Sequence, residues 1–287
     1  MTIICRKELR SYLTSMTGYV FIAFILLLTG IYFTAYNLSM GYPVFGYTLS
    51  SITFAFLIIT PVLTMRVLAE EKKQKTDQLL LTAPISVAQI VAGKYLALAV
   101  IFLIPTAVLC LYPLIMSSFG DVSLSMAYTA VLGFFLLGCA NISIGVFLSS
   151  VTESQIIAAV LTFAVLFVSY MMSGIEGLFG ETAFVSFTVF AILILAVCVG
   201  IYYMLRNAFV GIVAGVAGEG ALLAVYLIKP ALFEGAVQKF LSIFDLTSHF
   251  SNFVDGMLDF TGIVYYLSVI LIFLFLTVQS IQKRRWS

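Results

Sequence analysis

Long stretches without a charged residue alternate with short polar segments along this chain. The first stretch, Ser11–Met65, contains no Asp, Glu, Lys or Arg and is long enough for two membrane-spanning helices. One such helix needs about 20 apolar residues, each of which adds about 1.5 Å of length. The pattern therefore predicts an all-α polytopic membrane protein. Four further charge-free stretches can each hold at least one span: Tyr95–Gly120, Val122–Thr152, Thr182–Leu205 and Phe260–Gln282.

About eight transmembrane helices fit this pattern within a single domain, residues 1–287. The turn-forming residues of Leu38–Tyr47 separate the first two. An alternative merges the fifth to seventh spans into re-entrant elements, which gives six spans and leaves the two chain ends on the same side. The eight expected spans are Tyr19–Asn37, Thr48–Leu68, Gly93–Met116, Ser125–Ser149, Ser154–Met172, Ala183–Leu205, Ala208–Ile228 and Thr261–Ile281.

The basic residues predict the orientation of these spans. Cytoplasmic segments carry an excess of Lys and Arg. A cytoplasmic N-terminus leaves only Lys229 and Lys239 outside, of the 14 Lys and Arg in the chain. An even number of spans then places the C-terminus in the cytoplasm as well. The basic residues expected inside are Arg6, Lys7, Arg10, Arg66, Lys72, Lys73, Lys75, Lys94, Arg206, Lys283, Arg284 and Arg285.

Composition agrees with a surface that faces lipid. The chain is 62% hydrophobic and 9% charged, with a mean hydropathy of +1.16, whereas soluble domains carry about 25% charged residues. A formal net charge of +1 provides no broad basic field for nucleic acid. Membrane lipid is therefore an expected partner of the chain, and nucleic acid is not.

Two amphipathic segments flank the spans. In Ile3–Thr17 the apolar and charged residues separate roughly onto opposite helical faces, so this segment can lie flat on the inner leaflet. The alternative is a simple positively charged anchor. Residues 229–260 form an extracytoplasmic segment in which Phe and Leu recur at near-helical spacing over Val237–Asp259. We expect two short helices there, which either gate the outer mouth or only pack on the spans.

The longest cytoplasmic connection, residues 69–92, joins the second and third expected spans. Three consecutive leucines, Leu79–Leu81, lie within it. Exposed leucines require a cover, which lipid headgroups, the protein's own loops or a soluble partner can each provide. The connection opens with acidic and then basic residues: Glu70, Glu71, Lys72, Lys73 and Lys75.

A short cytoplasmic helix is expected inside this connection. Thr76 or Asp77 can begin it, because their side-chain oxygens accept hydrogen bonds from the free amides of a first helical turn. The helix must end near Ala83, because Pro84 disfavours helical geometry in the residue before it. Ser86 can then cap the helix that leads into the third span.

The stretch Met65–Lys94 resembles the coupling region of ABC type-2 (exporter) permeases. In that family a Glu-rich exit from the second span leads to a short helix with Thr, Leu-Leu and Pro. The segment Arg6–Tyr12 resembles the family's interfacial elbow helix, and Gly145–Gln155 resembles its turn between the fourth and fifth spans. Nearly the whole chain is covered. Closing segments that resemble the gliding-motility-associated branch are Ser248–Phe250, Asp255, Gly256, Asp259, Val264–Leu267 and Arg284–Trp286.

The resemblance implies a permease subunit in a bacterial inner membrane. It would form a translocation pathway with a second permease subunit, identical or different, and two separate ABC ATPase subunits would dock below. The partner ATPase would use ATP and Mg²⁺, while this chain would bind no cofactor; it contains no GxxxxGK[ST] phosphate loop. Residues expected to form the ATPase-coupling segment are Glu70, Glu71, Thr76, Asp77, Leu79, Leu80, Leu81 and Pro84.

Two positions in the coupling segment depart from the family's pattern. Lys75 occupies a position that is often Gly, and Gln78 occupies one that is often Glu. The coupling geometry is expected to be kept. These two replacements are instead expected to change the electrostatic interactions with the partner.

Glu219 is an unusual residue, because it lies midway along the seventh expected span. A charged carboxylate at that depth costs about 2.5–3.5 kcal/mol and must face protein or water. One interpretation is a pathway-lining or proton-linked group, which would also suit the rival hypothesis of a secondary transporter or channel. The other is a neutral Glu hydrogen-bonded between helices, or a re-entrant turn whose tip reaches solvent.

Three glycines near Glu219 predict close helix packing. Gly211, Gly215 and Gly218 lie at or near the spacing that lets two membrane helices approach. The contact is expected within the subunit, and a contact across a dimer is the alternative.

An enzymatic function is not predicted by the residue inventory. The chain has neither an HExxH nor a GxSxG motif, and His249 is its only histidine. Its four cysteines form no CxxC pair. Neither a catalytic pair nor a metal site is therefore expected.

Overall fold

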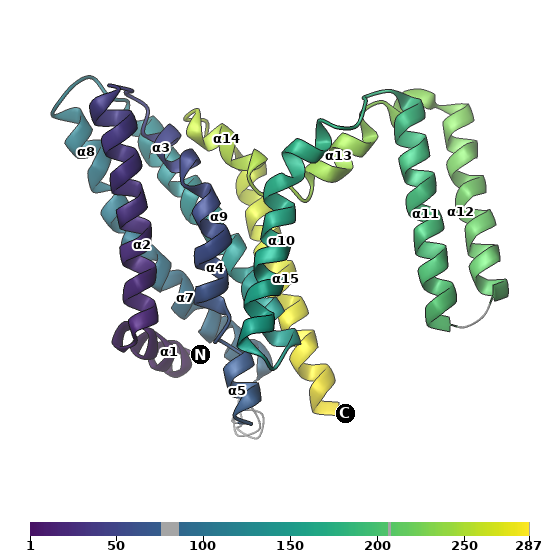
Figure 1. Ribbon diagram of the computed structural model, residues 1–287, viewed down its shortest axis with the longest axis horizontal. Coiled ribbons are helices and arrows are strands. Elements are labelled where there is room, and N and C mark those ends of the chain that lie inside the picture. The colour runs from purple at the N-terminus through teal and green to yellow at the C-terminus, as the bar shows by residue number, and fades with distance from the viewer. Residues whose placement is uncertain (76–85, 206–207, 287) are drawn as a thin grey trace. The chain divides into compact units, whose positions relative to one another are not determined.

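The computed structural model describes residues 1–75, 86–205 and 208–286, and these residues are helical with no strand among them (Figure 1). The chain divides into two compact units. Unit 1 comprises Met1–Tyr170 and Leu246–Ser287, and unit 2 comprises Met171–Asp245. Each unit is described by itself.

Unit 1 is a helical bundle in which many helices are interrupted or short. The long helix α10 starts in this unit and its last residues belong to unit 2. In chain order the elements are α1 (Thr2–Thr14), α2 (Met16–Phe33), the π-helix η1 (Thr34–Ser39), α3 (Phe45–Ser51), the 3₁₀-helix η2 (Thr53–Ala55), α4 (Phe56–Thr64), α5 (Ala69–Lys73), α7 (Val87–Leu109), α8 (Leu111–Ser117), α9 (Leu124–Val151), α10 (Gln155–Glu176), α14 (Ser248–Val254) and α15 (Phe260–Trp286).

Six helical stretches in the described residues are long and apolar enough to cross a membrane. They correspond to the first five and the eighth of the spans expected from the sequence, so an all-α polytopic membrane protein is confirmed. Several of these stretches combine consecutive helices; the second, for example, runs from α3 through α5. The six stretches are Met16–Ser39, Phe45–Lys73, Val87–Ser117, Leu124–Val151, Gln155–Glu176 and Phe260–Lys283.

The loop between the first two spans is shorter than the sequence predicted. Helical structure continues to Ser39 and resumes at Phe45, where Thr48 had been expected to open the second span. Asn37 explains the tight connection. Its Nδ2 donates to the carbonyl oxygen of Tyr42 at 2.8 Å, and its Oδ1 accepts from the hydroxyl of Thr48 at 2.6 Å.

Helix α9 lies at the centre of unit 1 and contacts α4, α7, α14 and α15. Its glycines allow these close approaches. A Cβ on Gly133 would lie 2.6 Å from Phe253, one on Gly138 would lie 2.2 Å from Phe102, and one on Gly145 would lie 2.3 Å from Thr64. Small residues let membrane helices pack closely where the hydrophobic effect offers little driving force.

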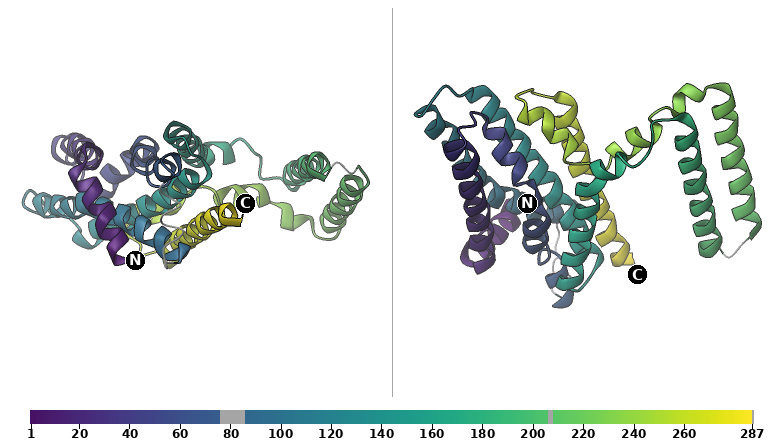
Figure 2. Two further views of the ribbon diagram at one scale, coloured as in Figure 1. Left: turned by 90° about the horizontal axis from the view of Figure 1, so that it is seen from below. Right: turned by 45° about the horizontal axis from the view of Figure 1, so that its top comes forward.

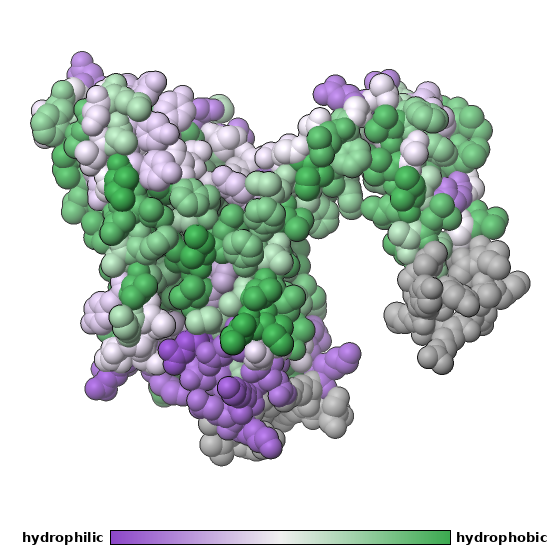
Figure 3. Space-filling view, in the orientation of Figure 1, coloured by the Kyte–Doolittle hydropathy of each residue, from purple (hydrophilic) through white to green (hydrophobic). Residues whose placement is uncertain are grey.

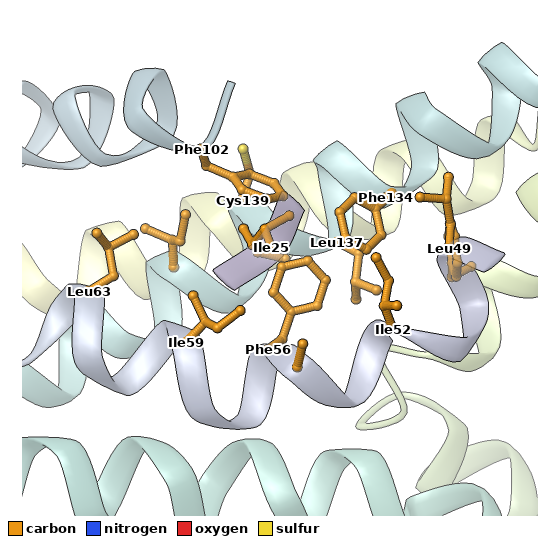
Figure 4. Packing of buried hydrophobic residues seen from close by; sticks show 14 of the residues in the cluster. Ile25, Leu49, Ile52, Phe56, Ile59, Leu63, Phe102, Phe134, Leu137 and Cys139 are labelled. Atoms are coloured by element: carbon orange, nitrogen blue, oxygen red, sulfur yellow. The ribbon is translucent and has the colours of Figure 1, made fainter. Parts of the chain in front are cut away.

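An apolar stripe of the second span packs toward α7 and α9. Ile52, Phe56, Ile59 and Leu63 recur at helical spacing, and Figure 4 shows them pointing to the same side of their helix. The rings of Phe56, Phe102 and Phe134 meet there, with centroids 4.9–5.9 Å apart. This packing positions the last turns of the second span, and α5 follows directly from them.

Unit 2 contains the helices that the sequence predicted as the sixth and seventh spans. Helix α11 (Ala183–Leu205) and helix α12 (Ala208–Ile228) have the expected bounds and pack against each other. They are followed by the 3₁₀-helix η3 (Pro230–Phe233) and by α13 (Ala236–Ser242). A sharp bend of 114° separates Gly215–Ile228 from Pro230–Ser242, so this pair is a broken span or a re-entrant loop. The number of crossings here stays a prediction.

The two short helices expected within Val237–Asp259 both form. They are α13 and α14, and they belong to different units. In unit 2, Gln238 of α13 donates from Nε2 to the carbonyl oxygen of Phe179 at 2.9 Å. In unit 1, α14 packs on α3 and α9. Each helix is therefore held by packing within its own unit, and a gating role for the two helices stays a prediction.

Candidate functional site at the α5 end of unit 1

One end of unit 1 brings together several charged segments of the chain. Helix α5, the start of α7, the end of α15 and helix α1 all lie there, and α1 runs across the bundle instead of along it (Figures 1 and 2). Figure 3 shows hydrophilic residues concentrated at this end, below a broad apolar surface. We call it the α5 end. The segment expected to couple to an ATPase leaves and re-enters the bundle at this place.

The side chain of Ser149, near the end of α9, holds the start of α5. Its Oγ accepts hydrogen bonds from the backbone amides of Leu68 at 3.2 Å and Ala69 at 3.1 Å, and it donates to the carbonyl oxygen of Met65 at 3.3 Å. These amides belong to the first turn of a helix, where no intrahelical acceptor exists. Ser149 thus acts as a helix cap supplied by another helix.

A second contact joins α5 to the end of α9. The Nζ of Lys72 donates to the carbonyl oxygen of Ser150, and the hydroxyl of Ser280 on α15 donates to the same oxygen at 3.3 Å. Lys72 is buried although it lies in a cluster of basic residues. Two adjacent residues in the last turn of α9, Ser149 and Ser150, therefore bind α5.

A buried ion cluster connects three elements at the α5 end. The side chain of Lys94 on α7 is 1% exposed, and its Nζ lies 2.9 Å from Oε1 of Glu8 and 2.7 Å from Oε1 of Glu71. The same Nζ donates to the carbonyl oxygen of Val67 at 2.9 Å. Glu8 belongs to α1 and Glu71 to α5. We call Lys94, Glu8 and Glu71 the Lys94 cluster.

Burial gives the Lys94 cluster its mechanical importance. A buried ammonium group without partners costs several kcal/mol, and removal of one partner from a buried pair costs about 3–5 kcal/mol. Lys94 reaches three acceptors, which is the full donor capacity of an ammonium group. Separation of α1 or α5 from α7 would leave this charge poorly satisfied, so the three elements are held together.

Helix α1 rests directly on the start of α7. A Cβ on Gly93 would lie 3.1 Å from the backbone oxygen of Met1 and 3.2 Å from Cβ of Ile4, so a small residue is needed there. The hydroxyl of Tyr12 donates to the carbonyl oxygen of Leu63 at 2.9 Å. Burial, and then the nearby Glu8 carboxylate, raise the pKa of Tyr12, which keeps this hydroxyl protonated as a donor.

The exit from α5 has an unusual backbone conformation. Arg66 and Glu70 pair through two contacts, of 2.8 and 3.3 Å, before the helix ends. Lys75 then adopts a φ of 56°, the left-handed region that favours glycine. Its amide donates to the carbonyl oxygen of Lys72 at 3.1 Å, which is one of the bonds of a left-handed helix C-cap. The need for this conformation explains why glycine suits the position.

The re-entry into α7 agrees with the sequence. Ser86 caps α7, and its Oγ accepts from the amide of Gln89 at 3.3 Å. The helix begins at Val87, six residues before the expected start of the span at Gly93, because this cap supplies a first turn outside the apolar run. Of the expected coupling residues, Glu70 and Glu71 are engaged in the ion pairs above. The others lie outside the described residues: Thr76, Asp77, Leu79, Leu80, Leu81 and Pro84.

The polar and small residues singled out in α12 form no part of the α5 end. Glu219 lies on α12 with its Oε1 buried, and no described residue is hydrogen-bonded to that atom. A Cβ on Gly218 would lie 3.1 Å from Ile194, and one on Gly215 would lie 3.6 Å from Cys198. Both glycines therefore face α11 of the same chain, and Gly211 lies on the same helix.

Sequence reasoning did not identify the partners of Lys94 or the role of Ser149. The useful signal for Lys94 was a lysine inside a helix that is otherwise apolar. Such a residue needs an acidic partner, and few carboxylates are available near that end of the bundle. No comparable signal marks Ser149, because a serine near the end of a span is ordinary.

A family model described as ABC-2 family transporter protein matches residues 37–284. The chain belongs to this family. No curated protein matches it. The matched range includes α5, the Lys94 position and all six membrane-length stretches in whole or part, while α1 precedes it.

Membership makes this ABC-2 chain a transmembrane permease of an ABC transporter and a multi-pass membrane protein. The family also implies a partnership with an ABC ATPase. The narrower gliding-motility-associated branch stays a prediction, as does the bacterial inner membrane. The α5 end is the candidate contact site for that ATPase. There α5 is held by contacts with α9 and through the Lys94 cluster with α1 and α7.

Proposed function

We propose that this ABC-2 permease is an exporter subunit driven by a separate ATPase that contacts the segment between α5 and α7. Two permease subunits, identical or different, would line the pathway in a bacterial inner membrane, and two ATPase subunits would bind at the α5 end. ATP and Mg²⁺ would be used by the ATPase. This chain would carry no catalytic residue and bind no cofactor.

The anchoring of both ends of the segment is the observation that supports this proposal most. Glu71 lies just before the segment and Lys94 just after it, and their side chains pair at 2.7 Å. Ser149 and Ser150 fix α5 to α9. A force applied to the segment would therefore reach the second, third and fourth spans and α1 together. Such rigid-body transmission is how a partner can switch a packed bundle between two arrangements.

Co-purification provides the test. The permease and a candidate ATPase from the same genome would be co-expressed, and the ATPase retained by the tagged permease would be measured. We expect retention by the native chain and its loss when Leu79, Leu80 and Leu81 are all replaced by Ser. Replacement of the exposed Leu38 by Ser is the control, because η1 lies away from the α5 end, and this variant should retain the ATPase. If the native chain and the triple serine variant retain equal amounts of the ATPase, the coupling role of this segment is contradicted.

A secondary transporter or channel based on Glu219 is the second candidate function. The buried Oε1 of Glu219 is the observation that favours it. The two candidates differ in a reconstituted system. Transport by the permease alone, without an ATPase and abolished by Glu219→Gln, would support the second candidate. ATP-dependent transport that is unchanged by Glu219→Gln would support the first.

A further inference from the structure

A small pocket with both apolar and polar walls lies in unit 1, beside the interruption of the second span. Its volume is about 20 Å³, and a cavity of about 10–15 Å³ is enough for one water molecule. The second span, α9, α10 and the stretch before α14 each contribute to its wall. The residues used below are Thr53, Phe56, Asn141, Ser169, Tyr170 and Thr247.

Asn141 is the most polar side chain in this pocket and is 5% exposed. No described residue forms a hydrogen bond with its amide. Other buried polar side chains of α9 bond to their own helix; Ser143, for example, donates to the carbonyl oxygen of Ala140 at 2.7 Å. Asn141 forms no such bond and faces the pocket. A buried amide carries two donors and two acceptor sites, which need partners in a membrane interior.

The pocket offers hydrogen bonds and no charge. The hydroxyl of Thr53 donates to the carbonyl oxygen of Ser50 at 2.8 Å, which leaves its lone pairs as acceptors. Ser169, Tyr170 and Thr247 add further hydroxyl groups. No Asp, Glu, Lys, Arg or His is among the residues that line it. A charged ligand would be unpaired here, so the suitable occupant is one neutral group with both donor and acceptor capacity.

The backbone next to the pocket is not regular α-helix. Between α3 and α4, the amide of Ile52 donates to Leu49 at 3.2 Å and the amide of Ala55 donates to Ile52 at 2.9 Å. Both bonds span three residues, as in a 3₁₀-helix. A 3₁₀ stretch within a long helix often marks a hinge, and inserted water is one recognised cause of helix bending. The helix beyond this interruption, α4, leads directly to α5.

We propose that Asn141 binds one water molecule in this pocket, against the 3₁₀ interruption, and so forms a hydrated joint in the second span. The water satisfies the amide of Asn141 and bridges it to the hydroxyl groups around it. The joint lets α4, with α5 attached, tilt relative to α3 without loss of hydrogen bonds. Water binding stands independently of the proposed function, whereas the use of the joint during transport rests on it.

X-ray radiolytic footprinting of the purified full-length permease tests the water site, since the radicals form from water next to the labelled side chain. We expect Phe56 and Tyr170 to be labelled, while the buried Phe102 and Phe134, which do not line the pocket, stay unlabelled. Asn141→Leu replaces the amide with an apolar group of similar size, so the water loses its main partner, and the labelling of Phe56 should fall several-fold. Asn141→Ser keeps a hydroxyl and should retain it.

Each outcome decides the proposal. Unlabelled Phe56 in the native protein, or equal labelling in Asn141→Leu, would overturn it. If Asn141→Leu fails to fold by circular dichroism and gel filtration, the labelling of Phe56 relative to Phe134 is compared between the native protein and Asn141→Ser. We expect equal labelling in the two proteins. Loss of labelling in Asn141→Ser would contradict the proposal that hydrogen-bonding groups alone hold the water.

Hydrogen exchange tests the joint separately. We expect amides from Ile52 to Phe56 to exchange several-fold more slowly in Asn141→Leu than in the native protein, with α15 unchanged as the reference. Unchanged exchange at these amides would remove the hinge and leave the water site intact. Failure of the ATPase to co-purify would instead contradict the proposed function, and would leave both of these measurements unaffected.

Discussion

The Nζ of Lys94 and the Oε1 of Glu71 lie 2.7 Å apart although 23 residues separate them in the chain. This pair joins the last turn of the second span to the early part of the third. It therefore joins the two flanks of the stretch that the sequence predicts to be a coupling segment. Glu8, which is 86 residues from Lys94, joins the same cluster and adds α1 to it.

Replacement of Lys94 by Met is predicted to destabilise the protein strongly. The change removes the Lys94 ammonium group from the carboxylates of Glu8 and Glu71, which are 13% and 17% exposed. Loss of one partner from a buried ion pair costs about 3–5 kcal/mol. Thermal unfolding in detergent measures the effect. The control is Lys73→Met on the exposed face of α5, which should change little, and equal midpoints for the two variants would refute the prediction.

Neutral replacement of the whole Lys94 cluster should recover much of that loss. The triple variant Glu8→Gln, Glu71→Gln, Lys94→Met removes the uncompensated charges, and neutral substitutes for buried ion pairs are often tolerated. We expect the triple variant to unfold at a higher temperature than Lys94→Met. A triple variant that is less stable than Lys94→Met would show that the three groups act independently.

Ser149→Ala is predicted to loosen α5 by removing its cap. The hydroxyl accepts from two backbone amides, Leu68 and Ala69, and loss of a helix cap costs about 0.5–2 kcal/mol. Faster hydrogen exchange at these two amides is the expected result. Ser143→Ala is the matched control on the same helix, because its hydroxyl bonds only to Ala140. Exchange that rises equally in both variants would contradict the capping role.

Lys75→Gly is predicted to stabilise the exit from α5. The φ of 56° at Lys75 strains an L-residue by about 1–2 kcal/mol, while glycine adopts it freely. Glycine loses more entropy on folding, so we expect a net gain of about 0.5–1 kcal/mol. The reference is Lys73→Gly, within the helix, which should destabilise the protein by a similar amount. A loss of stability in Lys75→Gly would contradict the assignment of this conformation.

Gly138→Ala is predicted to disrupt the packing of α9 against α7. The new Cβ would lie 2.2 Å from the ring of Phe102, which is itself enclosed by Phe56 and Phe134. Overpacking of this kind costs about 1–3 kcal/mol. Gly174→Ala on α10 is the control, since nothing lies within 4 Å of its Cβ position. Phe102→Leu should partly rescue Gly138→Ala, and thermal unfolding distinguishes these cases.

The membrane spans could be predicted from the sequence wherever the length of an apolar run alone determines them. A membrane helix must bury its own polar backbone, so charge-free runs translate directly into spans, and Ser86 could be recognised as a cap from its position. The interruption at Ile52–Ala55 could not be predicted, because this stretch contains neither Gly nor Pro to mark a break in a helix.

The coupling role of the candidate site stays a prediction, and the interactions that its described residues form could not be predicted. Glu70 and Glu71 were assigned to the coupling segment from their order in the chain. Their partners depend on which helix ends meet, and Glu8 and Lys94 are brought together only by the way α1 crosses the bundle. Contacts between distant residues such as these require tertiary structure. The glycine preference at Lys75 was known only from the resemblance to the family, and the φ of 56° at this residue explains it.

The arrangement of the Lys94 cluster also bears on how the protein is made. Glu8 and Glu71 both precede Lys94 in the chain, so they emerge from the ribosome first. When the third span inserts, the carboxylates that neutralise its lysine are already at the membrane surface. A lysine that was buried at this end of the helix ahead of its partners would carry an unpaired charge, which is costly to take out of water. The order of synthesis thus matches the order in which these charges are needed.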